Sequence, residues 1–89
     1  PRISPALARW FVEQRVALIG VETPSVASVN EGFLPELIEV HQTLLGGGVT
    51  IVEGLVHLDQ LHHTEVDFIV LPLKIRGCDG SPVRAIAVE

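Results

Sequence analysis

The chain has 89 residues, of which 47% are hydrophobic and 19% are charged, and its formal net charge is −5. This acidity and the lack of a Lys/Arg cluster argue against nucleic acid and anionic membrane as partners. The single Cys78 cannot form an intramolecular disulfide, which fits a reducing setting, so we expect a cytoplasmic protein. No apolar run approaches a membrane span and no signal peptide is recognisable. A chain this short buries a modest share of its surface. Its apolar excess therefore predicts a homo-oligomer or contact with a missing part of the polypeptide.

A helix is expected near the start of the chain. Ser4 followed by Pro5 is typical of a helix start, with the serine as N-cap and the proline at the first helical position. Apolar residues follow at helical spacing, and the helix is expected to end at about Gln14. The apolar face predicted for it consists of Leu7, Trp10 and Phe11.

A short buried strand over residues 16–19 is expected to follow, and then a second helix beginning at Pro35. The glycines at 46–48 are expected to end that helix, because glycine has poor helix propensity and accepts the left-handed conformation of a C-terminal cap. The face predicted for the second helix contains Leu37, Ile38, His41, Leu44 and Leu45.

The second half of the chain is expected to be mainly strand. The pattern predicts strands over 49–56, 67–75 and 82–88, a helical turn over 58–61, and a turn at Asp79–Gly80. The resulting order, α-β-α-β-β-β, predicts a mixed α/β or α+β fold. Residues 1–89 are interpreted as one partial domain.

His41 and Glu53 are the main chemical candidates, and they flank the glycine-rich corner. Glu53 lies in an apolar run that is expected to be a strand. An ionised carboxylate there is costly unless something neutralises it, and a metal ion shared with the imidazole would do so. The alternative is a partly buried core histidine and a strand-end carboxylate in a salt bridge. The spacing matches no short zinc motif, so spacing alone favours this alternative.

The other candidates give weaker signals. The glycines at 46–48 lack the Lys-Ser/Thr that a phosphate-binding loop requires after its last glycine. His62 and His63 would point to opposite faces of a strand and lie in a polar stretch, so we interpret them as a solvated turn. Cys78 has no base or positive dipole nearby in the sequence. No catalytic or cofactor-binding residue is therefore predicted.

Four segments, in this order, resemble the cyclase family of metal-dependent hydrolases, which includes bacterial kynurenine formamidases (arylformamidases) and isatin hydrolase. The segments are 4–10, 18–26, 41–55 and 71–85. The resemblance covers nearly the whole chain and implies the C-terminal portion of such an enzyme. It further implies a swivelling β/β/α domain that is usually dimeric.

In this family a zinc or manganese centre activates water against an amide or lactam carbonyl. The resemblance places His41 and Glu53 at two of the metal ligands, which reverses the inference from spacing alone. The remaining ligands belong to a His-x-Gly-Thr-His-x-Asp motif that this sequence lacks, and Glu22 replaces a common aspartate.

We therefore expect a portion of a hydrolase that cleaves the C–N bond of a small-molecule aryl formamide or cyclic amide. The isolated 89 residues are expected to be inactive. The alternative hypothesis is a non-catalytic binding or oligomerisation module with an incomplete metal site.

Overall fold

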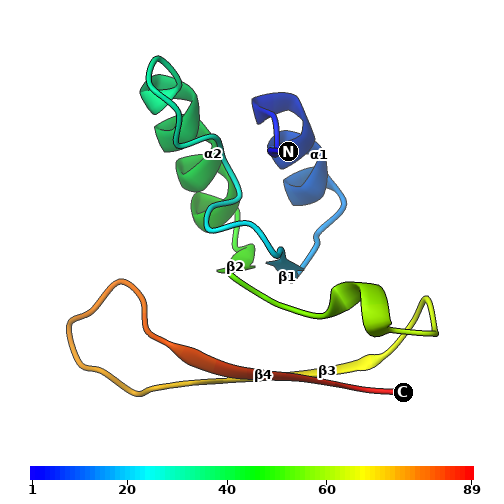
Figure 1. Cartoon of the computed structure of the whole chain (residues 1–89). Coiled ribbons are helices and arrows are strands. Elements are labelled where there is room, and N and C mark those ends of the chain that lie inside the picture. Colours follow the sequence, from blue (N-terminus) through cyan, green and yellow to red (C-terminus); the bar gives the residue numbers. More distant parts are fainter. The chain divides into compact units, whose positions relative to one another are not determined.

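The computed structural model describes all 89 residues and divides them into two compact units, Pro1–Val56 and His57–Glu89. The first unit contains α1 (Pro5–Glu13), β1 (Leu18–Gly20), α2 (Leu34–Gly46) and β2 (Thr50–Val52). The second contains the 3₁₀ turn η1 (Leu58–Gln60), β3 (Asp67–Pro72) and β4 (Val83–Val88) (Figure 1). This element order confirms the predicted mixture of helix and strand. Neither α-helix has the length and apolar character that crossing a membrane requires.

Helix α1 begins and ends close to its predicted limits. The Ser4 hydroxyl accepts a hydrogen bond from the Leu7 amide at 3.2 Å, which confirms the predicted N-cap. At the other end, Arg15 adopts a left-handed φ of 56°. The amides of Arg15 and Val16 donate to carbonyls three and five residues earlier, as in a Schellman cap. The following strand therefore starts at Leu18, two residues later than predicted, because the cap occupies the preceding residues.

The glycines at 46–48 lie at the end of α2, and each has a different conformation. Gly46 is still helical, and Gly47 is the C-cap with a φ of −88°. Gly48 carries the left-handed φ of 84°. The amides of Gly48 and Val49 donate to carbonyls three and five residues earlier, which completes a second Schellman cap. The predicted left-handed cap is confirmed at the last of the three glycines.

Strands β1 and β2 pair in parallel, with Ile19 opposite Ile51, and α2 lies in the connection between them. This is a compact β-α-β unit, and parallel pairing requires such a crossover. Strand β2 ends at Val52, so the predicted strand over 49–56 is too long. The chain turns away because Gly54 has a left-handed φ of 71° and its amide donates to the Thr23 carbonyl.

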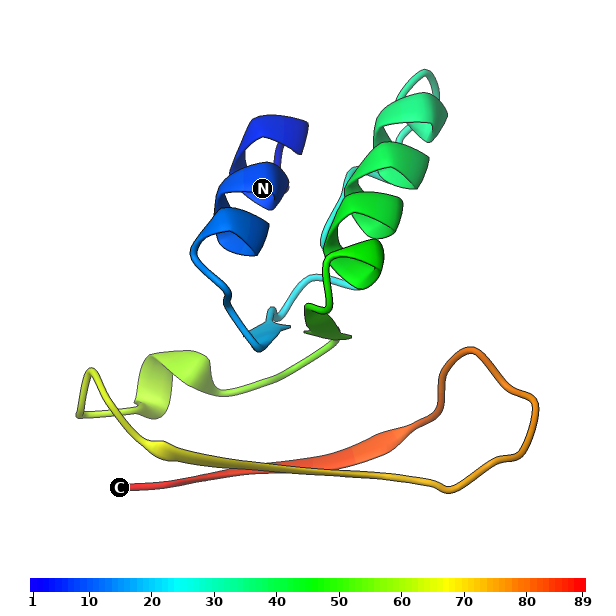
Figure 2. The same cartoon turned by 180° about the vertical axis from the view of Figure 1, so that it is seen from behind.

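Helices α1 and α2 lie side by side above this strand pair in both views (Figure 1 and Figure 2). The predicted apolar faces are partly wrong, because the helices pack through different residues. Ala8 is fully buried, whereas Trp10 is 51% exposed. On α2, Val40 and Leu44 are fully buried, whereas Leu45 is 58% exposed. The two helices pack closely where the small Ala8 lies between them, and the larger indole of Trp10 stays exposed to solvent. The core consists of Ile3, Ala8, Ile19, Val26, Ala27, Val40, Leu44 and Val49.

The second unit is an antiparallel hairpin, with a register that runs from Asp67 opposite Val88 to Pro72 opposite Val83. Strand β3 ends at Pro72, three residues before the predicted limit; proline has no amide hydrogen to continue the ladder. No residue of this unit is buried. Its exposed large apolar side chains are Leu58, Phe68, Ile69, Leu71, Leu73, Ile75, Val83, Ile86 and Val88.

Candidate metal centre

The imidazole of His41 is held by its own helix. Its Nδ1 lies 2.9 Å from the carbonyl oxygen of Leu37, one turn earlier on α2. A carbonyl can only accept a hydrogen bond, so Nδ1 must carry the proton and donate it. In the neutral ring, Nε2 then presents a lone pair away from the helix. Metal-binding histidines commonly have this arrangement, because a backbone carbonyl fixes their tautomer and orientation.

Glu53 lies immediately after β2, and its side chain is 31% exposed. Its Oε2 accepts a hydrogen bond of 2.7 Å from the backbone amide of Val26. A bond this short is typical of a charged acceptor. The expectation of a carboxylate inside an apolar strand is therefore wrong. Solvent and the Val26 amide already stabilise the charge, so burial alone does not require a cation.

The structure brings the two predicted residues together within the first unit. His41 Nε2 and Glu53 Oε2 are 3.6 Å apart, too far for a direct hydrogen bond. Two ligands on one Zn²⁺ at a tetrahedral angle, with bonds of about 2.0–2.2 Å, lie about 3.4 Å apart. The nitrogen and oxygen atoms therefore fit a shared divalent cation. They fit equally a loose salt bridge when His41 is protonated.

These two residues do not make a complete site. No group of three His, Cys, Asp or Glu side chains in the structure is arranged to hold a metal ion. A structural zinc ion needs four ligands, and a catalytic one usually takes three from the protein. His41 and Glu53 are therefore at most part of a coordination sphere.

His62 and His63 occupy the second unit and are largely exposed, as the interpretation of a solvated turn required. The sequence did not indicate their shared partner, Glu89. His63 Nδ1 lies 2.6 Å from Glu89 Oε2, and the His62 amide donates to Oε1 at 2.8 Å. The His62 amide first, and then the His63 side chain, lower the pKa of Glu89. Alternation along a strand predicted that the two histidines would lie on opposite faces. This prediction does not apply, because both residues precede β3 and do not belong to a strand.

Sequence reasoning also missed a pocket of about 320 Å³ in the first unit. Most of its lining comes from the loop that follows β1, including Thr23, Ser25 and Phe33. Neither His41 nor Glu53 lines it. The loop nevertheless adjoins the pair, because Val26, the residue after Ser25, donates to Glu53.

Comparisons with known proteins relate nearly the whole chain to one group of enzymes. It is 40% identical over 87 residues to kynurenine formamidase of Polaromonas naphthalenivorans (strain CJ2), covering 98% of this chain and 37% of that protein. It is 40% identical over 85 residues to kynurenine formamidase of Geobacillus thermodenitrificans (strain NG80-2), covering 96% of this chain and 38% of the relative.

A solved structure described as a potential metal-dependent hydrolase with cyclase activity matches 97% of this chain and 40% of its own length. Its TM-score is 0.72 and its sequence identity is 25%. No protein-family model matches the chain. The chain spans about two fifths of the proteins that it matches. It is homologous, over nearly its whole length, to part of the kynurenine formamidases and of a cyclase-like metal-dependent hydrolase.

Proposed function

We propose that this chain forms the C-terminal portion of a metal-dependent hydrolase that cleaves the C–N bond of an aryl formamide or cyclic amide. His41 and Glu53 provide two ligands for a Zn²⁺ or Mn²⁺ ion. The observation that carries the proposal is the facing pair of acceptor atoms, Nε2 and Oε2, at 3.6 Å. Homology to kynurenine formamidase supplies the reaction class.

The second contact that each residue makes supports the ligand roles. Nδ1 of His41 keeps its proton on the Leu37 carbonyl, which leaves the Nε2 lone pair available. The Val26 amide occupies one lone pair of Glu53 Oε2 and holds the carboxylate toward His41. These contacts orient both donors before any ion binds, which lowers the ordering cost of binding.

The donor set is one imidazole nitrogen and one carboxylate oxygen, without a thiolate. Such a set suits Zn²⁺ or Mn²⁺ better than a soft metal. When bound, the ion supplies Lewis-acid activation of water and of the amide carbonyl. His41 and Glu53 hold it, and the proton-transfer group belongs to the part of the enzyme outside these 89 residues.

The proposal extends to the complete domain, its assembly and its location. The chain completes a swivelling β/β/α domain together with the rest of such an enzyme. That enzyme works as a dimer in the cytoplasm. The exposed apolar side chains of β3 and β4 favour burial against other parts of this assembly.

A binding experiment on the chain tests the ligand assignment. Zn²⁺ and then Mn²⁺ are titrated into the 89-residue chain while NMR signals of the His41 ring and Glu53 carboxyl carbon are followed. We expect weak Zn²⁺ binding that shifts both signals and Mn²⁺ binding that broadens them, because Mn²⁺ is paramagnetic. His41→Ala and Glu53→Gln should each abolish both effects. His63→Ala is the matched control and should not change this binding. Shifts confined to His62 and His63 would contradict the assignment.

A chimera tests the reaction and separates it from the alternative of a non-catalytic module. The matching 87-residue segment of the Polaromonas naphthalenivorans relative is replaced by this chain. We expect metal-dependent hydrolysis of an aryl formamide, and a loss of about 100-fold or more when His41→Ala removes a ligand. A folded, metal-loaded chimera without turnover would favour the module.

A further inference from the structure

The loop after β1 is attached to the segment that carries Glu53. Three backbone hydrogen bonds of 2.9–3.0 Å flank that residue on both sides. They run from Val21 N to Val52 O, from Gly54 N to Thr23 O, and from Leu55 N to Val21 O. The main chain before and after Glu53 is therefore fixed against residues 21–23. The orientation of its carboxylate then depends on the next few residues of the loop.

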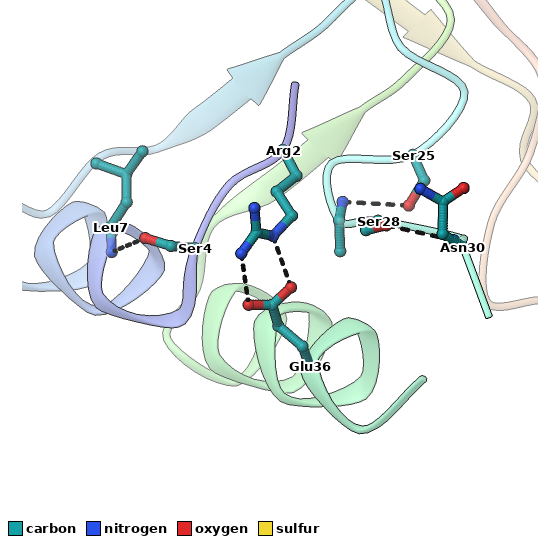
Figure 3. Close-up of polar contacts among 8 residues, drawn as sticks. Arg2, Ser4, Leu7, Ser25, Ser28, Asn30 and Glu36 are labelled. Atoms are coloured by element: carbon teal, nitrogen blue, oxygen red, sulfur yellow. Dashed lines mark hydrogen bonds and ion pairs between the residues drawn. The ribbon is translucent and has the colours of Figure 1, made fainter. Parts of the chain in front are cut away.

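Two hydroxyl groups set the conformation of those residues. The Thr23 hydroxyl donates to the Ser25 carbonyl at 2.7 Å. The Ser25 hydroxyl in turn accepts from the Ala27 amide at 3.2 Å, a bond drawn in Figure 3. Pro24 lies between them and fixes its own φ. Local side-chain bonds of this kind give the backbone a defined turn outside helix and sheet.

The consequence of this turn is the direction of one amide. Val26 lies between the two hydroxyl-bonded positions, and its N–H points to Glu53 Oε2 at 2.7 Å. The side chains of Val26 and Ala27 are 1% and 3% exposed, so the core anchors the loop beyond the turn. Glu53 Oε2 is also the atom that faces His41.

We infer that Thr23 and Ser25 are positioning residues, which act through the Val26 amide to hold the Glu53 carboxylate toward His41. Their effect on metal affinity rests on the proposed function. Their effect on the Val26–Glu53 hydrogen bond does not. Partners that orient metal ligands typically change affinity by about 10–100-fold when mutated.

The test compares Thr23→Val, which removes the hydroxyl with little change of shape, with Thr23→Ser, which keeps it. Ser25→Ala is the second variant. Ser28→Ala is the matched control, because Ser28 accepts from the Asn30 amide in the same loop (Figure 3) and has no hydrogen bond to Glu53. The readouts are hydrogen exchange of the Val26 amide without metal, the Glu53 carboxyl carbon shift, and Zn²⁺ affinity by NMR titration.

We expect Thr23→Val and Ser25→Ala to speed exchange at Val26 about two- to tenfold and to move the Glu53 carboxyl signal. Thr23→Ser and Ser28→Ala should behave like the parent chain. Zn²⁺ affinity should fall about tenfold or more in Thr23→Val. In a Glu53→Ala background, which removes the acceptor of the Val26 amide, Thr23→Val should not speed Val26 exchange any further. A general structural effect would still speed it.

Unchanged Val26 exchange and an unchanged Glu53 signal in both variants would overturn the inference. If the parent chain binds no Zn²⁺ at His41, the proposed function fails. Altered Val26 and Glu53 signals would still support the positioning role in that case. If Zn²⁺ binds equally well to the parent chain and to Thr23→Val, the inference fails and the ligand assignment stands.

Discussion

The two units of this chain bury their apolar residues very differently. All nine buried hydrophobic residues lie between Ile3 and Val52, in the first unit. The second unit, His57–Glu89, has none, and its hairpin exposes apolar side chains on both faces. A two-stranded hairpin is marginally stable in water without packing against other structure. The first unit therefore has its own core, whereas the second has no buried residue to stabilise its hairpin.

The largest expected effect is loss of core packing in the first unit. Leu44→Ala should lower the free energy of unfolding by about 2–5 kcal/mol, because it leaves a cavity at a fully buried position. Leu45→Ala is the matched control at an adjacent position that is 58% exposed. Ile86→Ala, in the second unit at 45% exposure, should likewise leave no buried cavity. Urea unfolding followed by fluorescence of Trp10 measures the first two. Equal losses at positions 44 and 45 would contradict the proposed core.

Gly47 and Gly46 should respond in opposite directions to alanine. A Cβ at Gly47 would lie 2.5 Å from a Val12 methyl, whereas at Gly46 it would meet nothing within 4 Å. Gly47→Ala should therefore destabilise the first unit by about 1–3 kcal/mol through overpacking. Gly46→Ala should stabilise it by up to about 1 kcal/mol, because Gly46 is helical and alanine is the better helix former. Paired thermal melts measure both, and the same sign for both would contradict this packing.

Glu53 links the stability of the first unit to the candidate site. Glu53→Ala leaves the Val26 amide without its acceptor and should destabilise the unit by about 1–3 kcal/mol. Glu53→Gln keeps an oxygen that can accept this bond, so most of that stability should remain while metal binding is lost. Urea unfolding of both variants in the presence of a chelator measures the difference. Equal destabilisation would show that the charge matters more than the hydrogen bond.

The smallest effect concerns Glu89 in the second unit. Its pKa lies below the ordinary value of 4.5, because the His62 amide and the His63 side chain stabilise the carboxylate. The stabilisation of the second unit by the ionised Glu89 carboxylate is therefore complete above pH 4.5, the ordinary pKa. It is lost as the pH falls through the lowered pKa. The Glu89 carboxyl carbon shift and the protection of the His62 amide, relative to its intrinsic exchange rate at each pH, should change together on acidification. Glu89→Gln is the control, and protection that changes with pH in this variant as in the parent chain would contradict the assignment.

The element order was predictable because local signals specify it. Ser4-Pro5 begins the first helix, three glycines end the second, and apolar segments on either side of the Asp79-Gly80 turn signal predict the last two strands. The buried faces were less predictable. Periodicity favoured Trp10 and Leu45, but close contact between α1 and α2 buries Ala8 and Val40 instead. Both helices carry more apolar residues than one face can bury, so the packing between the helices determines which of these residues are buried.

The candidate site was likewise only partly predictable from the sequence. The sequence predicted His41 and Glu53 as ligands through a family resemblance, but the reason first given for Glu53, burial in an apolar strand, was wrong. It follows the strand and its side chain is 31% exposed, and its charge is stabilised by an amide 27 residues away in the sequence. The bonds from Thr23 and Ser25 are local in sequence, yet their target became visible only in the folded loop.

The sequence by itself determined the order of helices and strands and which side chains could serve as metal ligands, because caps, glycines and residue types act over a few residues. Only the tertiary structure decided which side chains are buried and that Nε2 of His41 faces Oε2 of Glu53 at 3.6 Å. That distance depends on the packing of α2 against β2 and on the loop that carries Val26. Contacts between residues far apart in the sequence leave no local pattern.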